Sequence, residues 1–228
     1  PMPQLMTRAA HRAALTQAAG DVGYLRQIGD EHLALHRPGG DTLLVTFECL
    51  DSTRARDGGL PLSSGLARKR GWATLDIMAE GRTWFRDDDL HDFFDGLTDD
   101  GFFDDYDTVV FAGGGMGAYG AAAHSVAAPG SIVFLMQPYA TLARDIAPWE
   151  RLFQAGHVMR LPATHAGTDI QARIEGIGIL NRLIAGAVND TLTPLRFAQL
   201  WRGRRQDPVW LTGLMRKIDR LDRPWLAA

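Results

Sequence analysis

Apolar and polar residues alternate in two short segments near the start of the chain, and apolar residues run without interruption in five later segments. Residues 23–29 and 31–37 alternate with a period of two and are separated by one turn residue, which predicts a half-buried hairpin. The continuous runs predict buried strands at residues 42–48, 72–78, 107–113, 131–138 and 157–162.

Segments with helical spacing of apolar residues separate most of these strands. They predict helices at residues 7–19, 63–71, 88–97, 117–127, 141–153 and 168–188. Strands that alternate with helices favour an α/β fold, with a mostly parallel sheet, helices on both faces and the hairpin as an antiparallel edge. We expect one α/β domain over residues 1–190 and a helical C-terminal appendage, residues 191–228, packed on it.

Composition excludes several classes of protein. The chain has 228 residues, 46% of them hydrophobic and 22% charged, which is unlike a collagen, a disordered or a disulfide-stapled protein. The single Cys49 cannot form an internal disulfide and favours a reducing, cytoplasmic location. The start of the chain has no signal-peptide core, and glycines interrupt the most apolar stretch, so no transmembrane segment is predicted.

Charge is distributed unevenly around a net charge of −3. That net charge argues against a large basic surface for nucleic acid. Residues 191–228 carry a charge of +5, whereas residues 87–107 contain ten Asp and no Lys or Arg. The acidic run is typical of a helix start followed by a solvated turn, because the spacing of a Ca²⁺-binding loop is absent. A cation site or a dock for the basic tail is the alternative.

The most informative segment is a glycine-rich turn between a predicted strand and an Ala-rich helix. We call residues Gly113–Gly117 the glycine turn. Such a turn either presents a nucleophile at a sharp bend or exposes helix N–H groups to an anion. Its five residues match the pattern G-x-S-x-G, except that Gly115 occupies the position of the serine nucleophile.

On this turn and the residues that follow, the chain resembles the α/β hydrolases, in particular a small bacterial subgroup with a degenerate nucleophile elbow. The segments Ser125–Gly130, Met136–Pro138 and Thr141–Asp145 extend the similarity, which covers residues 105–185. The resemblance implies a shortened three-layer sandwich. It also implies that His165, after the last predicted strand, is the catalytic histidine, and that Asp145 or Glu150 is the acid.

Gly115 offers no side-chain atom that could attack a carbonyl. Ser125 lies two helical turns further on, and Cys49, at the end of an earlier strand, is either a core residue or an unorthodox nucleophile. Glycine adopts a strained backbone conformation at little cost, so the substitution leaves a turn that presents the N–H groups of Gly115, Met116 and Gly117. The functional prediction is a hydrolase-like pseudoenzyme, non-catalytic or weakly hydrolytic, that binds a small acyl or anionic ligand without a cofactor.

Other interpretations stay open. Gly115-x-Gly117-x-x-Gly120 also satisfies the dinucleotide fingerprint, although Gln137 and Pro138 stand where its acidic residue is expected. Relatives of this subgroup carry a phosphoadenosine-phosphosulfate reductase label, which the lack of a C-terminal cysteine does not support. The tryptophans of the basic tail favour a scaffolding role or cover the sheet; they are Trp201, Trp210 and Trp225. His32 and His36 are not expected to share a metal, and the oligomeric state is left open.

Overall fold

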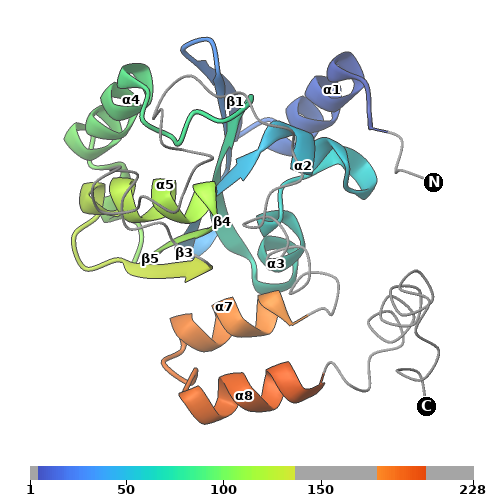
Figure 1. The fold of residues 1–228 in the computed structure, drawn as a ribbon. Coiled ribbons are helices and arrows are strands. Elements are labelled where there is room, and N and C mark those ends of the chain that lie inside the picture. Colours follow the sequence, from blue (N-terminus) through green and yellow to red (C-terminus); the bar gives the residue numbers. More distant parts are fainter. Residues whose placement is uncertain (1–4, 137–178, 204–228) are drawn as a thin grey trace, which may run out of the picture. The chain divides into compact units, whose positions relative to one another are not determined.

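The computed structural model describes residues 5–136 and 179–203. The chain divides into two compact units, Pro1–Thr168 and Asp169–Ala228 (Figure 1). The predicted helix at 141–153, the predicted strand at 157–162, most of the predicted helix at 168–188 and the end of the tail lie outside the described residues. The boundary predicted at residue 190 stays a prediction.

The first unit is built on a six-stranded, mostly parallel sheet, so the predicted α/β fold is confirmed. Its strands are β1 (Tyr24–Ile28), β2 (His32–Arg37), β3 (Gly40–Cys49), β4 (Trp72–Ala79), β5 (Thr108–Gly114) and β6 (Ile132–Met136). They lie in the order β1-β2-β4-β3-β5-β6. The pairs β4–β3, β3–β5 and β5–β6 are parallel, and β1 and β2 form the predicted antiparallel edge.

Strand β2 differs from the half-buried strand that its alternating sequence predicts. Residues from His32 to His36 are all buried, because other elements pack on both faces of the strand: Leu33 and Leu35 lie in one hydrophobic cluster and Ala34 lies in another. The polar members of the alternation are two histidines, and each finds a hydroxyl partner: His32 contacts Thr83 at 2.8 Å and His36 contacts Tyr106 at 3.3 Å. In this strand the alternation of polar and apolar residues therefore does not correspond to alternation of exposed and buried side chains.

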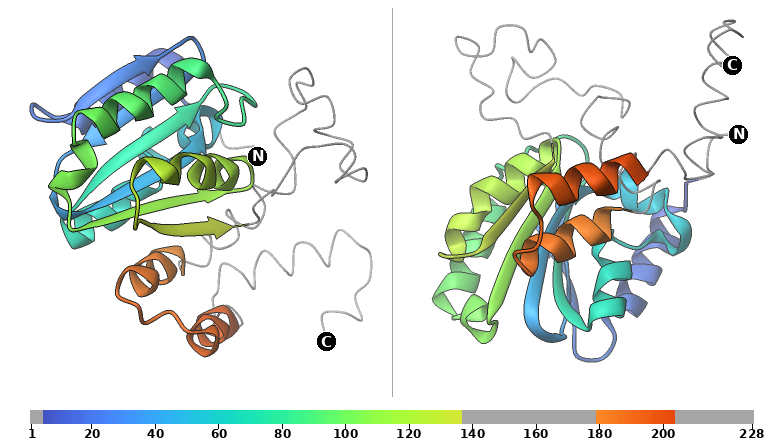
Figure 2. Two further views of the ribbon diagram at one scale, coloured as in Figure 1. Left: turned by 90° about the vertical axis from the view of Figure 1, so that its left-hand side faces the viewer. Right: turned by 90° about the horizontal axis from the view of Figure 1, so that it is seen from below.

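Helices cover both faces of the sheet (Figure 2). The helices are α1 (Arg8–Ala19), α2 (Leu50–Arg54), α3 (Ser63–Arg70), α4 (Asp88–Asp99) and α5 (Met116–His124). Helices α1 and α3 pack on one face, and α4 and α5 pack on the other. Helix α2 follows β3 directly. Among the described helices, none is long and apolar enough to cross a membrane.

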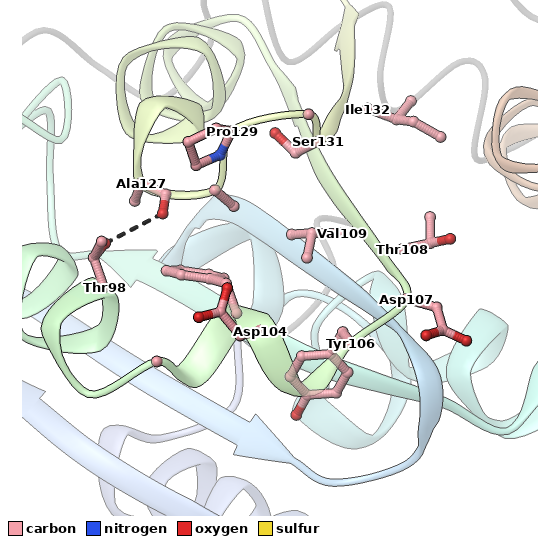
Figure 3. Close-up of a pocket in the computed structure, with 14 residues that line it drawn as sticks. Thr98, Asp104, Tyr106, Asp107, Thr108, Val109, Ala127, Pro129, Ser131 and Ile132 are labelled. Atoms are coloured by element: carbon pink, nitrogen blue, oxygen red, sulfur yellow. Dashed lines mark hydrogen bonds between the residues drawn. The ribbon is translucent and has the colours of Figure 1, made fainter.

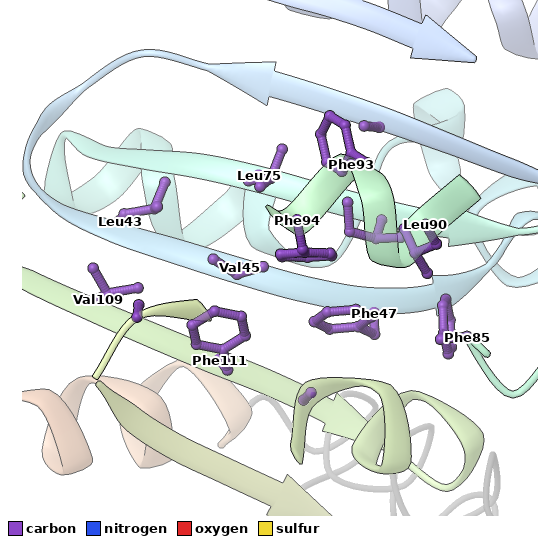
Figure 4. Close-up of a cluster of buried hydrophobic side chains, with 14 of the residues drawn as sticks. Leu43, Val45, Phe47, Leu75, Phe85, Leu90, Phe93, Phe94, Val109 and Phe111 are labelled. Carbon is purple, nitrogen blue, oxygen red and sulfur yellow. The ribbon is translucent and has the colours of Figure 1, made fainter. Parts of the chain in front are cut away.

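The face under α4 and α5 is aromatic (Figure 4). Phe47 of β3 stacks on Phe94 of α4 at a ring distance of 5.9 Å and meets Phe85 edge-on at 5.2 Å. Phe94 also lies 6.3 Å from Phe111 of β5. Burial of each such side chain contributes about 1.5–3 kcal/mol, so this cluster is a major source of stability for the unit.

The opposite face contains a buried polar network between the sheet and α3. Asp76 of β4 has no exposed surface, and the guanidinium of Arg37 lies 3.0 Å from its carboxylate. Every remaining bond of the network uses a hydroxyl: Arg37 donates to Ser63, Ser64 and Thr74, and Thr46 donates to Asp76. We call these six residues the Arg37 network. A buried ion pair needs such complete hydrogen bonding to offset its desolvation.

The acidic run of residues 87–107 behaves as a helix start and a turn. Asp87 caps α4 by accepting the N–H of Asp89, and Asp88 and Asp89 occupy the first helical turn. These carboxylates lie where the helix dipole favours negative charge. Within the described residues, no group of three or more His, Cys, Asp or Glu side chains is arranged to hold a metal ion.

The second unit contributes two described helices, α7 (Leu180–Val188) and α8 (Pro194–Gly203). Helix α7 ends where Asp190 adopts a left-handed conformation with φ 52°, and the N–H groups of Thr191 and Leu192 return to the carbonyl of Gly186. The Thr193 hydroxyl accepts the N–H of Arg196 at the start of α8. The two helices thus have local stop and start signals of their own.

Candidate functional site

The glycine turn joins β5 to α5 through an unusual backbone conformation. Gly115 has φ 57° and ψ −117°, which lies outside the left-handed helical region as well as the common regions. A residue with a side chain adopts such a conformation at a cost of about 1–3 kcal/mol. Glycine at this position therefore permits the sharp strand-to-helix bend without that strain.

The two outer glycines of the turn are required by close backbone contacts. A Cβ atom on Gly113 would lie 2.2 Å from the carbonyl oxygen of Gly117, and one on Gly117 would lie 2.1 Å from the carbonyl oxygen of Phe47. No heavy atom tolerates such distances without movement of the backbone. The turn therefore brings α5 onto β5 and β3 closely enough to exclude any side chain at these two positions.

The N–H groups of Gly115, Met116 and Gly117 were all expected to be available to a ligand, but the structure shows that one of them already has a partner. The N–H of Gly115 donates to the carbonyl of Met136 at the end of β6, at 2.9 Å, so the sheet already uses it. Met116 and Gly117 are the first two residues of α5, where N–H groups have no partner within the helix. In the described chain, no side chain caps α5 and its first turn contains no acidic residue.

The turn lies at a topological switch point of the sheet. Strand β3 is the neighbour of both β4 and β5, and the chain visits β4 before it crosses back to β5. Phe47 pairs with Gly113 at the last shared position of β3 and β5. Parallel α/β sheets bind ligands at the carboxyl ends of the strands where the order reverses, which is the position of the glycine turn.

Cys49, at the end of β3, belongs to this edge of the sheet, and its thiol is protonated at neutral pH. The pKa of Cys49 is raised to about 11, mainly by burial and also by the nearby carboxylates of Glu48 and Asp51, whereas Arg82 lowers it. A thiol must ionise to act as a nucleophile. This environment argues against Cys49 as the attacking group, and it identifies Arg82, on the β4–α4 loop, as a cation close to the end of β3.

The predicted histidine and acid cannot be compared with this edge. His165 and Asp145, together with the alternative Glu150, lie outside the described residues. Of the predicted site residues, the structure places Gly113, Gly115, Met116 and Gly117, and it joins them in one turn. These four remain candidate ligand-binding residues, with the N–H groups of Met116 and Gly117 as the donors.

The loop between β4 and α4 contributes residues that sequence reasoning missed. Trp84 and Phe85 are buried, although both precede an acidic helix start, and both have positive φ values, 57° and 55°. The N–H of Trp84 lies 3.4 Å from the sulfur of Met116, and the indole meets Tyr119 edge-on. No local sequence signal marks this contact, because turns with positive φ usually contain Gly or Asn.

A cavity of about 480 Å³ lies at the other end of the strands, where β5 and β6 begin. Figure 3 shows Asp104 and Tyr106 on one side of it, with Pro129 and Ser131 on the other. Its lining includes Thr108 and Ile132, the first residues of β5 and β6, so the cavity does not adjoin the glycine turn. We therefore do not assign it to the candidate site.

The histidines of β2 do not form a metal site. His32 and His36 point to the same face, but His32 contacts Thr83 and His36 contacts Tyr106. Burial lowers the pKa of both, which keeps the imidazoles neutral at pH 7. Both are therefore accounted for as core histidines.

Comparisons with protein-family models, with curated proteins and with solved structures found no match to this chain. The molecule is thus defined by its fold, an α/β sheet with helices on both faces, and by the glycine turn at its switch point.

Proposed function

We propose that this chain is an α/β-hydrolase-like protein without a serine nucleophile, which binds a small acyl or anionic ligand at the glycine turn. The observation that carries the proposal is the backbone of the turn: a strand leads into a bend at Gly115 with φ 57° and ψ −117°, and Gly113 and Gly117 touch across that bend. A nucleophile elbow needs this strand–turn–helix context and small residues at both outer positions.

The neighbouring strand supports the same proposal. In α/β hydrolases the oxyanion hole uses the N–H after the nucleophile and an N–H from the loop after the third strand. Here the corresponding groups are the N–H of Met116 and the start of the segment after Cys49, and Phe47 pairs with Gly113 at that edge. A carboxylate or a carbonyl oxygen is the chemical group that such donors bind.

Catalysis, if the protein performs it, would have to use water. His165 would act as general base toward a water molecule that attacks the ester carbonyl, Asp145 would orient His165, and the N–H of Met116 would stabilise the oxyanion. The C–O bond to the alcohol would then break, which releases a carboxylic acid and an alcohol. Triad enzymes that lose the nucleophile retain about 10³–10⁴-fold catalysis over water, so weak ester hydrolysis fits the proposal.

The dinucleotide alternative receives less support from the geometry. The second glycine of that fingerprint lets the backbone approach the pyrophosphate. In this chain the same residue, Gly117, directs its missing Cβ at the carbonyl of Phe47, so a protein strand occupies that approach. The reductase label has no support from a cysteine beyond Cys49, whose thiol is protonated.

The first experiment restores the missing nucleophile. Gly115→Ser completes G-x-S-x-G, and we expect the variant to react with a fluorophosphonate probe and to hydrolyse p-nitrophenyl butyrate at least tenfold faster than the wild type. Gly115→Ala introduces a matched Cβ without a hydroxyl and should do neither. Adding His165→Ala to Gly115→Ser should abolish the gain.

The second experiment measures binding by the natural sequence. We titrate the wild type with butyrate, with the neutral butyramide and with inorganic phosphate, followed by the amide NMR signals of Met116 and Gly117. Met116→Pro removes one candidate donor at a position where helices accept proline, and Met116→Leu separates loss of that N–H from loss of the thioether. An inert, folded Gly115→Ser together with no shift for any ligand would overturn the proposal. Shifts caused only by NAD would favour the dinucleotide alternative.

A further inference from the structure

The segment Thr83–Phe85, between β4 and α4, is held in a conformation that its sequence disfavours. Trp84 and Phe85 are consecutive residues with φ values of 57° and 55°, and neither is Gly, Asn or Asp. Bulky residues avoid positive φ, and they keep it only where surrounding contacts impose it. The side chains of Trp84 and Phe85 are 4% and 0% exposed, so those contacts lie inside the protein. We call Thr83–Phe85 the strap.

One stripe of α5 contacts the strap along its length. Met116, Gly120 and His124 are spaced four residues apart and share one side of the helix. The Met116 sulfur accepts the N–H of Trp84 at 3.4 Å, and the His124 ring donates from Nε2 to the carbonyl of Phe85 at 2.9 Å. A Cβ on Gly120 would lie 2.7 Å from the Phe85 ring, so the absent side chain makes room for the strap.

His124 is the titratable side chain among these α5 contacts, and its surroundings disfavour a charged ring. A second histidine, His32 of β2, also contacts the strap, through the Thr83 hydroxyl at 2.8 Å. Its imidazole stacks on Phe94 at a ring distance of 4.4 Å and on Phe47 at 5.7 Å. Burial lowers the pKa of His124 to about 4. Among the weaker contributions to this pKa, the hydrogen bond to the Phe85 carbonyl raises it, His91 of α4 and His32 of β2 lower it, and Asp95 of α4 raises it.

The hydrogen bond also determines which nitrogen can accept a proton. A carbonyl oxygen only accepts, so the neutral ring carries its hydrogen on Nε2, and acid protonates Nδ1. The resulting imidazolium would lie against two phenylalanine rings, with His32 and His91 as further basic groups nearby. Moving the charged ring to water would remove the donor to Phe85.

We propose that His124 is an acid-sensitive latch: the neutral ring holds the strap in its left-handed conformation against α5, and protonation releases it. Released from His124, Trp84 and Phe85 return to ordinary negative φ values, and the relief of strain favours the open state. The contact between Trp84 and Met116 is lost in the same step. The latch does not require the glycine turn to bind a ligand, so each proposal can fail without the other.

Amide hydrogen exchange tests the latch in the full-length protein. We measure protection factors at Trp84 and Phe85 between pH 7 and pH 4, corrected for the intrinsic pH dependence of exchange. As the pH decreases, we expect protection at both amides to fall at least tenfold more than protection at Val110–Ala112, in the middle of β5. An equal loss of protection in β5 would mean global acid unfolding and would overturn the latch. Protection factors at Trp84 and Phe85 that do not change with pH would overturn it as well.

Two variants separate the proton from the hydrogen bond. His124→Gln keeps an N–H donor that cannot titrate, and we expect the strap to stay protected down to pH 4. His124→Phe keeps an aromatic ring without a donor, and we expect a loose strap at every pH. A pH-dependent fall that persists in His124→Gln would overturn the proposal. If a variant does not fold, an NMR titration of the wild-type His124 ring must show the same midpoint as exchange at Phe85, and different midpoints overturn the latch.

Discussion

Helices α4 and α5 pack on the same face of the sheet, yet their N-termini are built from opposite chemistry. Helix α4 starts with the capping carboxylate of Asp87, followed by Asp88 and Asp89 in its first turn. In the described chain, α5 starts at Gly115 without a side-chain cap and without an acidic residue. The first helix supplies its own negative groups, and the second has no carboxylate beside the N–H groups of Met116 and Gly117.

The difference extends to how each helix uses glycine. Gly117 of α5 faces the carbonyl of Phe47, whereas a Cβ on Gly96 of α4 would meet no atom within 4 Å. One glycine is imposed by backbone contact and the other is not. The comparison teaches that α5 is positioned by its closeness to β3 and β5, while α4 is positioned by its capped end and its apolar side chains.

The largest expected effect comes from exchanging these glycines for alanine. Gly117→Ala forces a Cβ to within 2.1 Å of a backbone oxygen and should lower the free energy of unfolding by about 3 kcal/mol or more. Gly96→Ala, the matched control, should raise it by about 0.5–1 kcal/mol, because alanine is the better helix former. Urea unfolding measures both, and equal effects would refute the difference between the helices.

Acid should produce the next largest effect, through buried histidines. His11, His32, His36 and His124 all have pKa values below 6.5 in the folded chain, and that of His124 is about 4. As the pH falls below 6.5, the unfolded chain binds these protons first, so stability is complete above that pH and decreases toward pH 4. We expect a loss of roughly 1–3 kcal/mol from His124 alone.

Urea unfolding at pH 7 and at pH 5 measures this loss. His124→Phe removes the titrating ring from α5, so its stability should depend on pH less steeply than that of the wild type, even where it is less stable at pH 7. An identical dependence in both proteins would show that His124 does not contribute.

The smallest effect concerns the cap of α4. Asp87→Ala removes the acceptor of the Asp89 N–H and should lower stability by about 1 kcal/mol, whereas Asp87→Asn keeps a good capping residue and should change it less. Thermal unfolding of the two variants measures the difference. If both lose the same amount, the charge of Asp87 matters and its hydrogen bond does not.

The sequence predicts the alternation of strands and helices well, because the two edge strands alternate in polarity and each later strand in the described residues is a distinct apolar run. It does not predict that β4 inserts between β2 and β3, since the order of strands depends on the paths of the crossovers. The glycine turn is predicted because its spacing is local. The conformation of the strap is not predicted, because the hydrogen bond that holds it joins the carbonyl of Phe85 to His124, 39 residues away. Every residue has a backbone carbonyl, so the sequence does not mark this acceptor.

The Arg37 network is not predicted from the sequence either, because its contacts also join residues that are far apart along the chain. Arg37 looks like an ordinary surface residue of a hairpin, and Asp76 is a single carboxylate in a strand predicted to be buried. Their contact follows only from the pairing of β2 with β4. Ser63 and Ser64 lie at the start of α3, where hydroxyls are common. Nothing in their spacing indicates that both bond to one guanidinium.

The Arg37 network has a consequence for how the chain assembles. Neighbouring side chains on a strand point to opposite faces, so a slip of β2 by one position would turn Arg37 toward the aromatic rings. Asp76 would then be a buried carboxylate without its positively charged partner. Misaligned pairings are therefore far costlier here than in a purely apolar strand. A newly synthesised chain can join its antiparallel edge to the parallel strands in a single alignment.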